Sequence, residues 1–135
     1  MNMIILSALG LFFMLPNVLC LSEEMQELAN QLHDTCVGET GTTNDAIANA
    51  RNGNFEDSDS FKCYIKCLLD QMAIIDDDGI IDVDAMVAVL PDELKEKTEP
   101  IIRKCGTQKG ANPCENAWLT HKCYYKEGPE IYFLI

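Results

Sequence analysis

The amino-acid sequence predicts one small all-α domain that follows an apolar leader and is cross-linked by cysteines. Apolar side chains recur three and four positions apart through most of the chain, which is the spacing of an amphipathic helix. The alternation typical of strands is weak, and its only candidates are Ile80-Ile81 and residues 131–135. The chain of 135 residues has room for one domain beyond its leader and is too short for two.

The beginning of the chain has the pattern of a secretory signal peptide. Residues 3–15 form an almost unbroken apolar run, and the small residues Val18 and Cys20 occupy the positions that precede a cleavage site. A membrane anchor is the alternative, but the run is shorter than the roughly 20 residues that a spanning helix needs. We therefore expect residues 1–20 to be removed and residues 21–135 to form a secreted, extracellular domain.

Six helices are expected in order along this domain. Ser, Thr, Asp and Asn residues stand where helices begin, and they are the preferred N-terminal caps. Pro91 is expected to end the fourth helix, and Pro100 to bend the fifth. The expected helices run from Ser22 to the glycines at 38 and 41, and then over residues 46–51, 61–72, 83–90, 92–105 and 114–125.

The charge of the chain excludes some classes of partner. It carries 22 acidic and 10 basic residues, a net charge of −12, and has no block of basic residues to neutralise phosphates. Such acidity also repels anionic lipid surfaces and keeps a concentrated protein in solution. We expect no nucleic-acid partner, no stable membrane insertion, and a monomer or weak homodimer.

Six cysteines remain after the leader, and an even number in a small exported chain predicts disulfide bonds. A zinc site is the alternative, but it needs paired cysteine knuckles; only two of the six are close together in the sequence, and both histidines lie far from that pair. Three bridges would each constrain the unfolded chain by about 3–4 kcal/mol, which leaves room for an incomplete core. The spacing alone permits fifteen pairings of these residues: Cys36, Cys63, Cys67, Cys105, Cys114 and Cys123.

No set of catalytic residues emerges from the sequence. His33-Asp34 beside Cys36 is similar to part of the secreted phospholipase motif, but that motif also has adjacent cysteines and a calcium loop. The Asp76–Gly79 stretch is similar to part of an EF-hand loop, but counting back from its glycine places Ile74 where the first oxygen ligand should be. We expect a solvated turn there, and neither catalysis, nor a cofactor, nor a metal ion.

The function is therefore expected to reside in an apolar pocket with a few polar groups. A helical stripe is more often plain core than a ligand-binding wall, but the bridges can hold open a hollow that packing alone would fill. The stripes offer these candidates: Met72, Val83, Met86, Leu90, Leu94, Ile101, Trp118, His121 and Tyr124.

The cysteine ladder also resembles a known family. Successive cysteines are separated by 26, 3, 37, 8 and 8 residues. The surrounding matches are Leu32-His33-Asp34-x-Cys36, Cys63-Tyr64-x-x-Cys67-Leu68, Leu90-Pro91 and Tyr132-Phe133-Leu134. Together they resemble the six-cysteine form of the insect pheromone and general odorant-binding proteins, especially the antennal proteins of flies and mosquitoes.

The resemblance implies six helices around a central apolar cavity, with disulfides Cys36–Cys67, Cys63–Cys114 and Cys105–Cys123. The pocket positions that it implies are Val83, Met86, Leu90, His121, Tyr124, Tyr132, Phe133 and Leu134. Thr98 and Glu99 depart from the family, because they stand where relatives carry apolar pocket residues.

Residues 131–135 are too apolar to remain in water. The plain interpretation is a small strand that covers core, and the sharper one is a lid over the cavity mouth. By resemblance, the terminal carboxylate of Ile135 binds to His33 and Tyr64 and latches the lid. Acid would protonate the carboxylate, break the latch and loosen the lid.

The expected function is extracellular binding of a small hydrophobic volatile, an odorant or pheromone, and its transport to olfactory receptors, in sensillum lymph if the protein is olfactory. The alternative is a general carrier of hydrophobic molecules in non-olfactory secretions. A disulfide scaffold that acts through its surface, as an inhibitor or toxin, is a third class.

Overall fold

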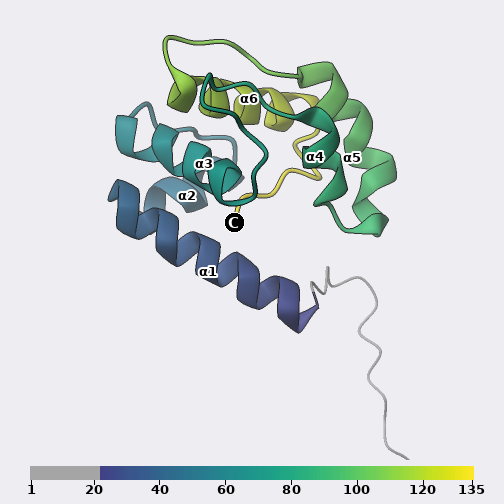
Figure 1. The fold of residues 1–135 in the computed structure, drawn as a ribbon, viewed down its shortest axis with the longest axis horizontal. Coiled ribbons are helices and arrows are strands. Elements are labelled where there is room, and N and C mark those ends of the chain that lie inside the picture. The colour runs from purple at the N-terminus through teal and green to yellow at the C-terminus, as the bar shows by residue number, and fades with distance from the viewer. Residues whose placement is uncertain (1–21) are drawn as a thin grey trace, which may run out of the picture.

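The computed structural model describes residues 22–135, which form six helices (Figure 1). The predicted leader lies outside the described residues and stays a prediction. No described helix is both long enough and apolar enough to cross a membrane. The helices are α1 (Glu23–Thr40), α2 (Asn44–Arg51), α3 (Asp59–Gln71), α4 (Val83–Ala88), α5 (Asp92–Cys105) and α6 (Pro113–Glu127).

Capping side chains set most of the helix boundaries. The side chains of Ser22, Thr43, Ser58, Asp82 and Asn112 each accept a hydrogen bond from a backbone N–H of the helix that follows. These bonds satisfy donors that have no partner within the helix. The prediction of six helices is confirmed, and their observed starts lie within a few residues of the expected ones.

The helix ends lie close to the expected ones, and α3 ends at Gln71, one residue before its expected end. The first helix continues through Gly38, and Gly41 closes it in the left-handed conformation with φ of 71°. Helix α4 ends at Ala88 rather than at residue 90, and α6 extends beyond Tyr125 to Glu127. Pro100 lies inside α5 without ending it.

Neither strand candidate forms a strand in the described part of the chain. Ile81 makes only an isolated bridge with Ile75, and residues 131–135 are irregular. The all-α prediction is therefore confirmed for residues 22–135.

Helix α3 lies at the centre of the fold and packs against α1 and α6, while α5 packs against both α4 and α6 (Figure 1). Four side chains of α3 are almost completely buried: Phe61, Tyr64, Ile65 and Leu69. Burying one large apolar side chain contributes roughly 1.5–3 kcal/mol, so this helix contributes much of the core energy. The C-terminal tail leaves α6 and ends in the middle of the molecule.

Three disulfides join the helices and confirm the pairing implied by the family resemblance. Cys36–Cys67 links α1 to α3, Cys63–Cys114 links α3 to α6, and Cys105–Cys123 links α5 to α6. Their Cα–Cα distances are 5.6, 4.6 and 5.9 Å. Four of the six helices are thus cross-linked, whereas α2, α4 and the tail carry no bridge.

Candidate functional site

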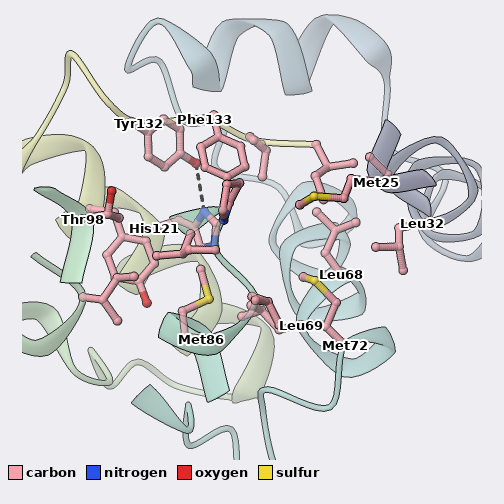
Figure 2. A pocket seen from close by; sticks show the side chains of 18 of the residues that line it. Met25, Leu32, Leu68, Leu69, Met72, Met86, Thr98, His121, Tyr132 and Phe133 are labelled. Atoms are coloured by element: carbon pink, nitrogen blue, oxygen red, sulfur yellow. Dashed lines mark hydrogen bonds between the residues drawn. The ribbon is translucent and has the colours of Figure 1, made fainter. Parts of the chain in front are cut away.

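A cavity of about 390 Å³ lies among the helices, within the size range of small-molecule pockets (Figure 2). Its wall contains no Asp, Glu, Lys or Arg side chain. Three methionines contribute to it, and their flexible thioether side chains adapt to ligands of different shape. The wall residues come from five helices or their ends and from the tail: residues 25, 28, 29 and 32; 68, 69, 71 and 72; 86 and 89–91; 98, 101 and 102; 121 and 124; and 131–135.

Most of the predicted pocket residues lie on this wall. They are Met72, Met86, Leu90, Ile101, His121, Tyr124, Tyr132, Phe133 and Leu134. Three predicted residues do not border the cavity: Val83, Leu94 and Trp118.

Val83 and Leu94 belong to the correct helices but to the wrong turns. Val83 opens α4 and packs against the core cluster that contains Ile102 and Cys105. Leu94 is half-buried in the first turn of α5, whereas the part of α5 that borders the cavity begins one turn later, at Thr98. An apolar stripe on a helix can be longer than the cavity that it faces, so the residues at the ends of the stripe pack in the core or lie at the surface.

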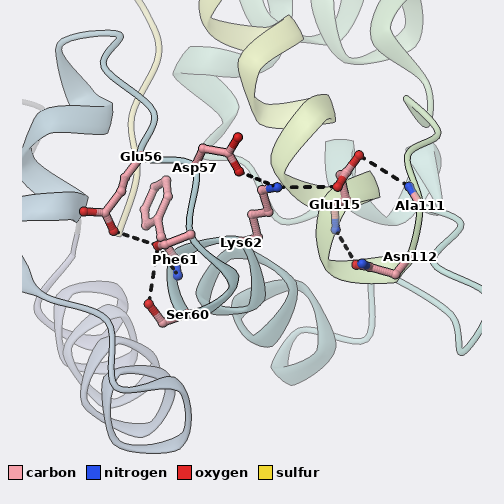
Figure 3. Close-up of polar contacts among 9 residues, drawn as sticks. Glu56, Asp57, Ser60, Phe61, Lys62, Ala111, Asn112 and Glu115 are labelled. Atoms are coloured by element: carbon pink, nitrogen blue, oxygen red, sulfur yellow. Dashed lines mark hydrogen bonds and ion pairs between the residues drawn. The ribbon is translucent and has the colours of Figure 1, made fainter.

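Trp118 faces cations instead of the cavity. The ammonium group of Lys62 lies 4.4 Å from the centre of its ring and that of Lys122 lies 4.3 Å away, which are cation–π distances. Lys62 is fixed there by carboxylates of Asp57, at 2.7 Å, and Glu115, at 3.4 Å (Figure 3). Trp118 and Lys62 thus help to join α3 to α6 beside the Cys63–Cys114 bridge.

The sequence prediction missed the contribution of α1 and part of α3. Met25, Leu28, Ala29 and Leu32 form one stripe at helical spacing, and all four border the cavity. This stripe was visible in the sequence as an amphipathic face, but periodicity does not distinguish a core-facing stripe from a cavity-facing one. The missed residues of α3 are Leu68, Leu69 and Gln71.

The C-terminal tail forms one wall of the cavity and is tied to three helices. Arg51 of α2 donates a hydrogen bond to the carbonyl oxygen of Leu134 at 2.9 Å. The hydroxyl of Tyr132 and Nδ1 of His121 in α6 are 2.9 Å apart. Leu134 is only 5% exposed, whereas Phe133 is 44% exposed. The tail therefore packs partly as core and partly as an accessible edge.

The third tie reaches α3 and differs in detail from the predicted latch. The hydroxyl of Tyr64 donates to the main-chain oxygen of Ile135, and Nδ1 of His33 lies 3.1 Å from the same hydroxyl. Because a hydroxyl has one proton, His33 donates to Tyr64 rather than accepting from it. Within residues 22–135 no ion pair joins His33 to Ile135, so the predicted direct contact is replaced by a relay through Tyr64. Burial raises the pKa of Tyr64 to about 12, so its hydroxyl stays protonated and able to donate.

His121 is a buried titratable group of the cavity wall. Its side chain is 7% exposed, and burial lowers its pKa from 6.5 to about 4. Burial likewise raises the pKa of Tyr124 and of Tyr132. At neutral pH the side chains of His121, Tyr124 and Tyr132 are therefore all uncharged. Across the described residues no cluster of three or more metal-ligating side chains occurs.

Comparison with known proteins places this architecture in a family. A sequence profile of the PBP/GOBP family, the pheromone-binding and general odorant-binding proteins, matches residues 20–127. The chain belongs to the PBP/GOBP family.

Individual proteins with odorant-binding names resemble the chain in sequence and in structure, which agrees with the family assignment. The chain is 33% identical to general odorant-binding protein 69a of Drosophila melanogaster over 95 residues, which are 70% of this chain and 64% of that relative. Odorant-binding protein 4 of Chrysopa pallens superposes with a TM-score of 0.75 at 34% identity, covering 85% of this chain and 99% of the other. Odorant-binding protein 7 of Anopheles gambiae, in complex with an azo compound, gives a TM-score of 0.72 at 28% identity, covering 82% and 91%.

The two residues that were expected to depart from the family pattern, Thr98 and Glu99, have different places in the structure. Thr98 borders the cavity, and its hydroxyl oxygen is buried. Glu99 is absent from the wall, and its carboxylate pairs with Arg103 at 2.8 Å. Thr98 therefore contributes a hydroxyl group to the cavity wall, whereas Glu99 contributes nothing to it.

Proposed function

We propose that this PBP/GOBP-family chain is an extracellular carrier that binds a small hydrophobic ligand, an odorant or pheromone, and transports it to olfactory receptors. The observation that carries the proposal is the 390 Å³ cavity whose wall has no charged side chain at neutral pH. Such a cavity favours an uncharged apolar ligand, because a buried ion without a partner is strongly destabilised. The three disulfides suit an extracellular fluid, where they are not reduced.

Displacement of the fluorescent probe N-phenyl-1-naphthylamine by volatiles tests the binding step. Met86→Gln introduces an amide into the wall and is expected to weaken binding at least about fivefold, since the amide lacks partners there. Val83→Gln is the matched control, because it lies on the same helix outside the cavity. Equal effects of the two variants, or no probe binding by the unaltered protein, would refute binding in this cavity.

Transport is tested separately, by recording from olfactory receptor cells. A volatile that displaces the probe is expected to raise the receptor response more when this protein is present in the bathing fluid. The Met86→Gln variant, which retains little ligand, is expected to give a smaller increase. If the receptor response to the volatile were the same with and without the protein, the transport role would be refuted, while ligand binding would stand.

We also propose that residues 131–135 act as a lid that releases the ligand in acid. Protonated His121 no longer accepts a hydrogen bond from Tyr132, and it places a positive charge in an apolar wall. Opening the lid would let water reach this charge, so protonation favours the open state. We expect ligand affinity to fall as the pH falls from 6.5 toward 4, the range between the ordinary pKa of histidine and that of His121.

Two variants test the lid. A chain that lacks residues 131–135 is expected to bind the probe more weakly at pH 7 and to lose most of the pH dependence. Tyr64→Phe removes one tie and is expected to weaken binding about three- to tenfold, while Tyr125→Phe, whose side chain lies outside the cavity wall, serves as its control. If the shortened chain kept both its affinity and its pH dependence, the lid proposal would be wrong.

A further inference from the structure

The cavity wall has one region of buried polar groups without hydrogen-bond partners. Five polar side-chain atoms in the described part of the chain are buried and have no hydrogen-bond partner. Three of them belong to residues that line the cavity: Oγ1 of Thr98, Nε2 of His121 and the hydroxyl of Tyr124. A buried polar atom without a partner costs about 1–3 kcal/mol, so three at one cavity require a reason.

These three groups lie on one side of the cavity. His121 and Tyr124 are successive wall residues of α6, with ring centres 5.1 Å apart, and Thr98 comes from the neighbouring helix α5. In Figure 2, Thr98 and His121 lie on one side of the pocket, and Leu32 and Met72 on the other. His121 is 7% exposed and Tyr124 is 8% exposed, and the unpartnered polar atom of each is buried.

All three groups are able to donate a hydrogen bond. Thr98 and Tyr124 carry hydroxyl protons. His121 is neutral at pH 7, and Tyr132 uses its only proton best by donating to Nδ1, which leaves the histidine proton on Nε2. The opposite tautomer would leave both the Tyr132 proton and Nε2 without partners. The region therefore presents donors and no group that only accepts.

We propose that the ligand carries a neutral carbonyl oxygen, as in an aliphatic ketone, aldehyde or ester, and binds with this oxygen between α5 and α6 at Thr98, His121 and Tyr124. A carbonyl oxygen has two lone pairs and accepts bonds from such donors. A carboxylate would need a cation, and the wall contains no Lys or Arg. The hydrocarbon part of the ligand then extends toward the side of Leu32 and Met72.

This inference rests on the proposed ligand binding, and two conservative variants of the full-length oxidised protein test it. Thr98→Val and Tyr124→Phe each remove one oxygen that has no hydrogen bond in the structure, so neither should disturb the fold. Thr42→Val is the matched control, because it removes a hydroxyl that is equally buried and unpartnered but does not border the cavity.

Affinities of decan-2-one, decan-2-ol, decane and decanoate are measured by displacement of N-phenyl-1-naphthylamine. Each cavity variant is expected to weaken decan-2-one about three- to tenfold and to leave decane unchanged or tighter, since one hydrogen bond contributes about 0.5–1.5 kcal/mol. Thr42→Val is expected to change neither. For each compound, the affinity for the variant is divided by the affinity for the unaltered protein. The compounds' different hydrophobicities therefore do not affect the result.

Three outcomes would overturn the inference. Equal changes for decan-2-one and decane would mean that the polar groups do not contact the ligand, while binding itself would stand. A variant effect on decan-2-ol alone, or tightest binding of decanoate, would replace the carbonyl by another head group. If the unaltered protein bound none of the four compounds or the probe, the proposed binding function would fail instead.

Discussion

Acid is expected to destabilise this protein through His121, and the size of the effect follows from its burial. The pKa of His121 is about 4 in the folded chain against an ordinary value of 6.5. Between these values the unfolded chain binds more protons than the folded one, so the free energy of unfolding falls as the pH falls. At 1.36 kcal/mol for each pH unit, the loss between pH 6.5 and pH 4 is about 3 kcal/mol. Above pH 6.5 His121 is neutral in both the folded and the unfolded chain, so it causes no loss in the free energy of unfolding there.

Urea unfolding of the oxidised protein at pH 7, 5.5 and 4 measures this loss. His121→Gln is the comparison, because its amide stays neutral at every pH and accepts a hydrogen bond from Tyr132. Both chains keep His33 and all the carboxylates, so their contributions cancel when one curve is subtracted from the other. The reasoning would be refuted if the unaltered chain and His121→Gln lost the same free energy of unfolding between pH 7 and pH 4.

Two further pairs of substitutions test the backbone of two turns and the packing of the tail. Gly79→Ala is expected to lower the free energy of unfolding by about 1–3 kcal/mol, because φ is 78° and the new Cβ would lie 2.7 Å from the backbone of Pro113. Gly41→Ala, at φ of 71° with no atom within 4 Å of its Cβ, should cost less, and the reverse order in urea unfolding would contradict this account. Leu134→Ala should destabilise the protein by about 2–5 kcal/mol, because the leucine is buried. Phe133→Ala should change stability by less than about 1 kcal/mol yet speed the dissociation of the probe, and equal stability losses would show that both side chains are core.

The helices could be predicted because their signals are local. Ser22, Thr43 and Asp82 cap helices in the sequence and in the structure, because a cap depends on residues only a few positions away. The disulfide pairing is not local in this sense. Spacing left fifteen pairings open, and only the family resemblance selected the observed one.

The cavity wall could be predicted only in part, because periodicity reports which face of a helix is apolar and not what that face contacts. The same signal led to the inclusion of Leu94 and the omission of Leu28, which borders the cavity and is exposed. Trp118 was assigned to the pocket because aromatic residues suit a ligand-binding wall. In the structure its ring contacts the ammonium groups of Lys62 in α3 and Lys122 in α6. Such contacts depend on tertiary geometry that the sequence pattern does not contain.

The disulfides restrict where a ligand can enter or leave. They join α1, α3, α5 and α6, so the walls of the cavity that carry no cross-link are α4 and the tail. Helix α4 has six residues and none of them is fully buried, whereas the tail buries Leu134 and has hydrogen bonds to α2, α3 and α6. Only the tail contacts His121 through a hydrogen bond that protonation would break. Ligand release that accelerates between pH 6.5 and pH 4 therefore points to the tail, and release at a rate independent of pH points to α4.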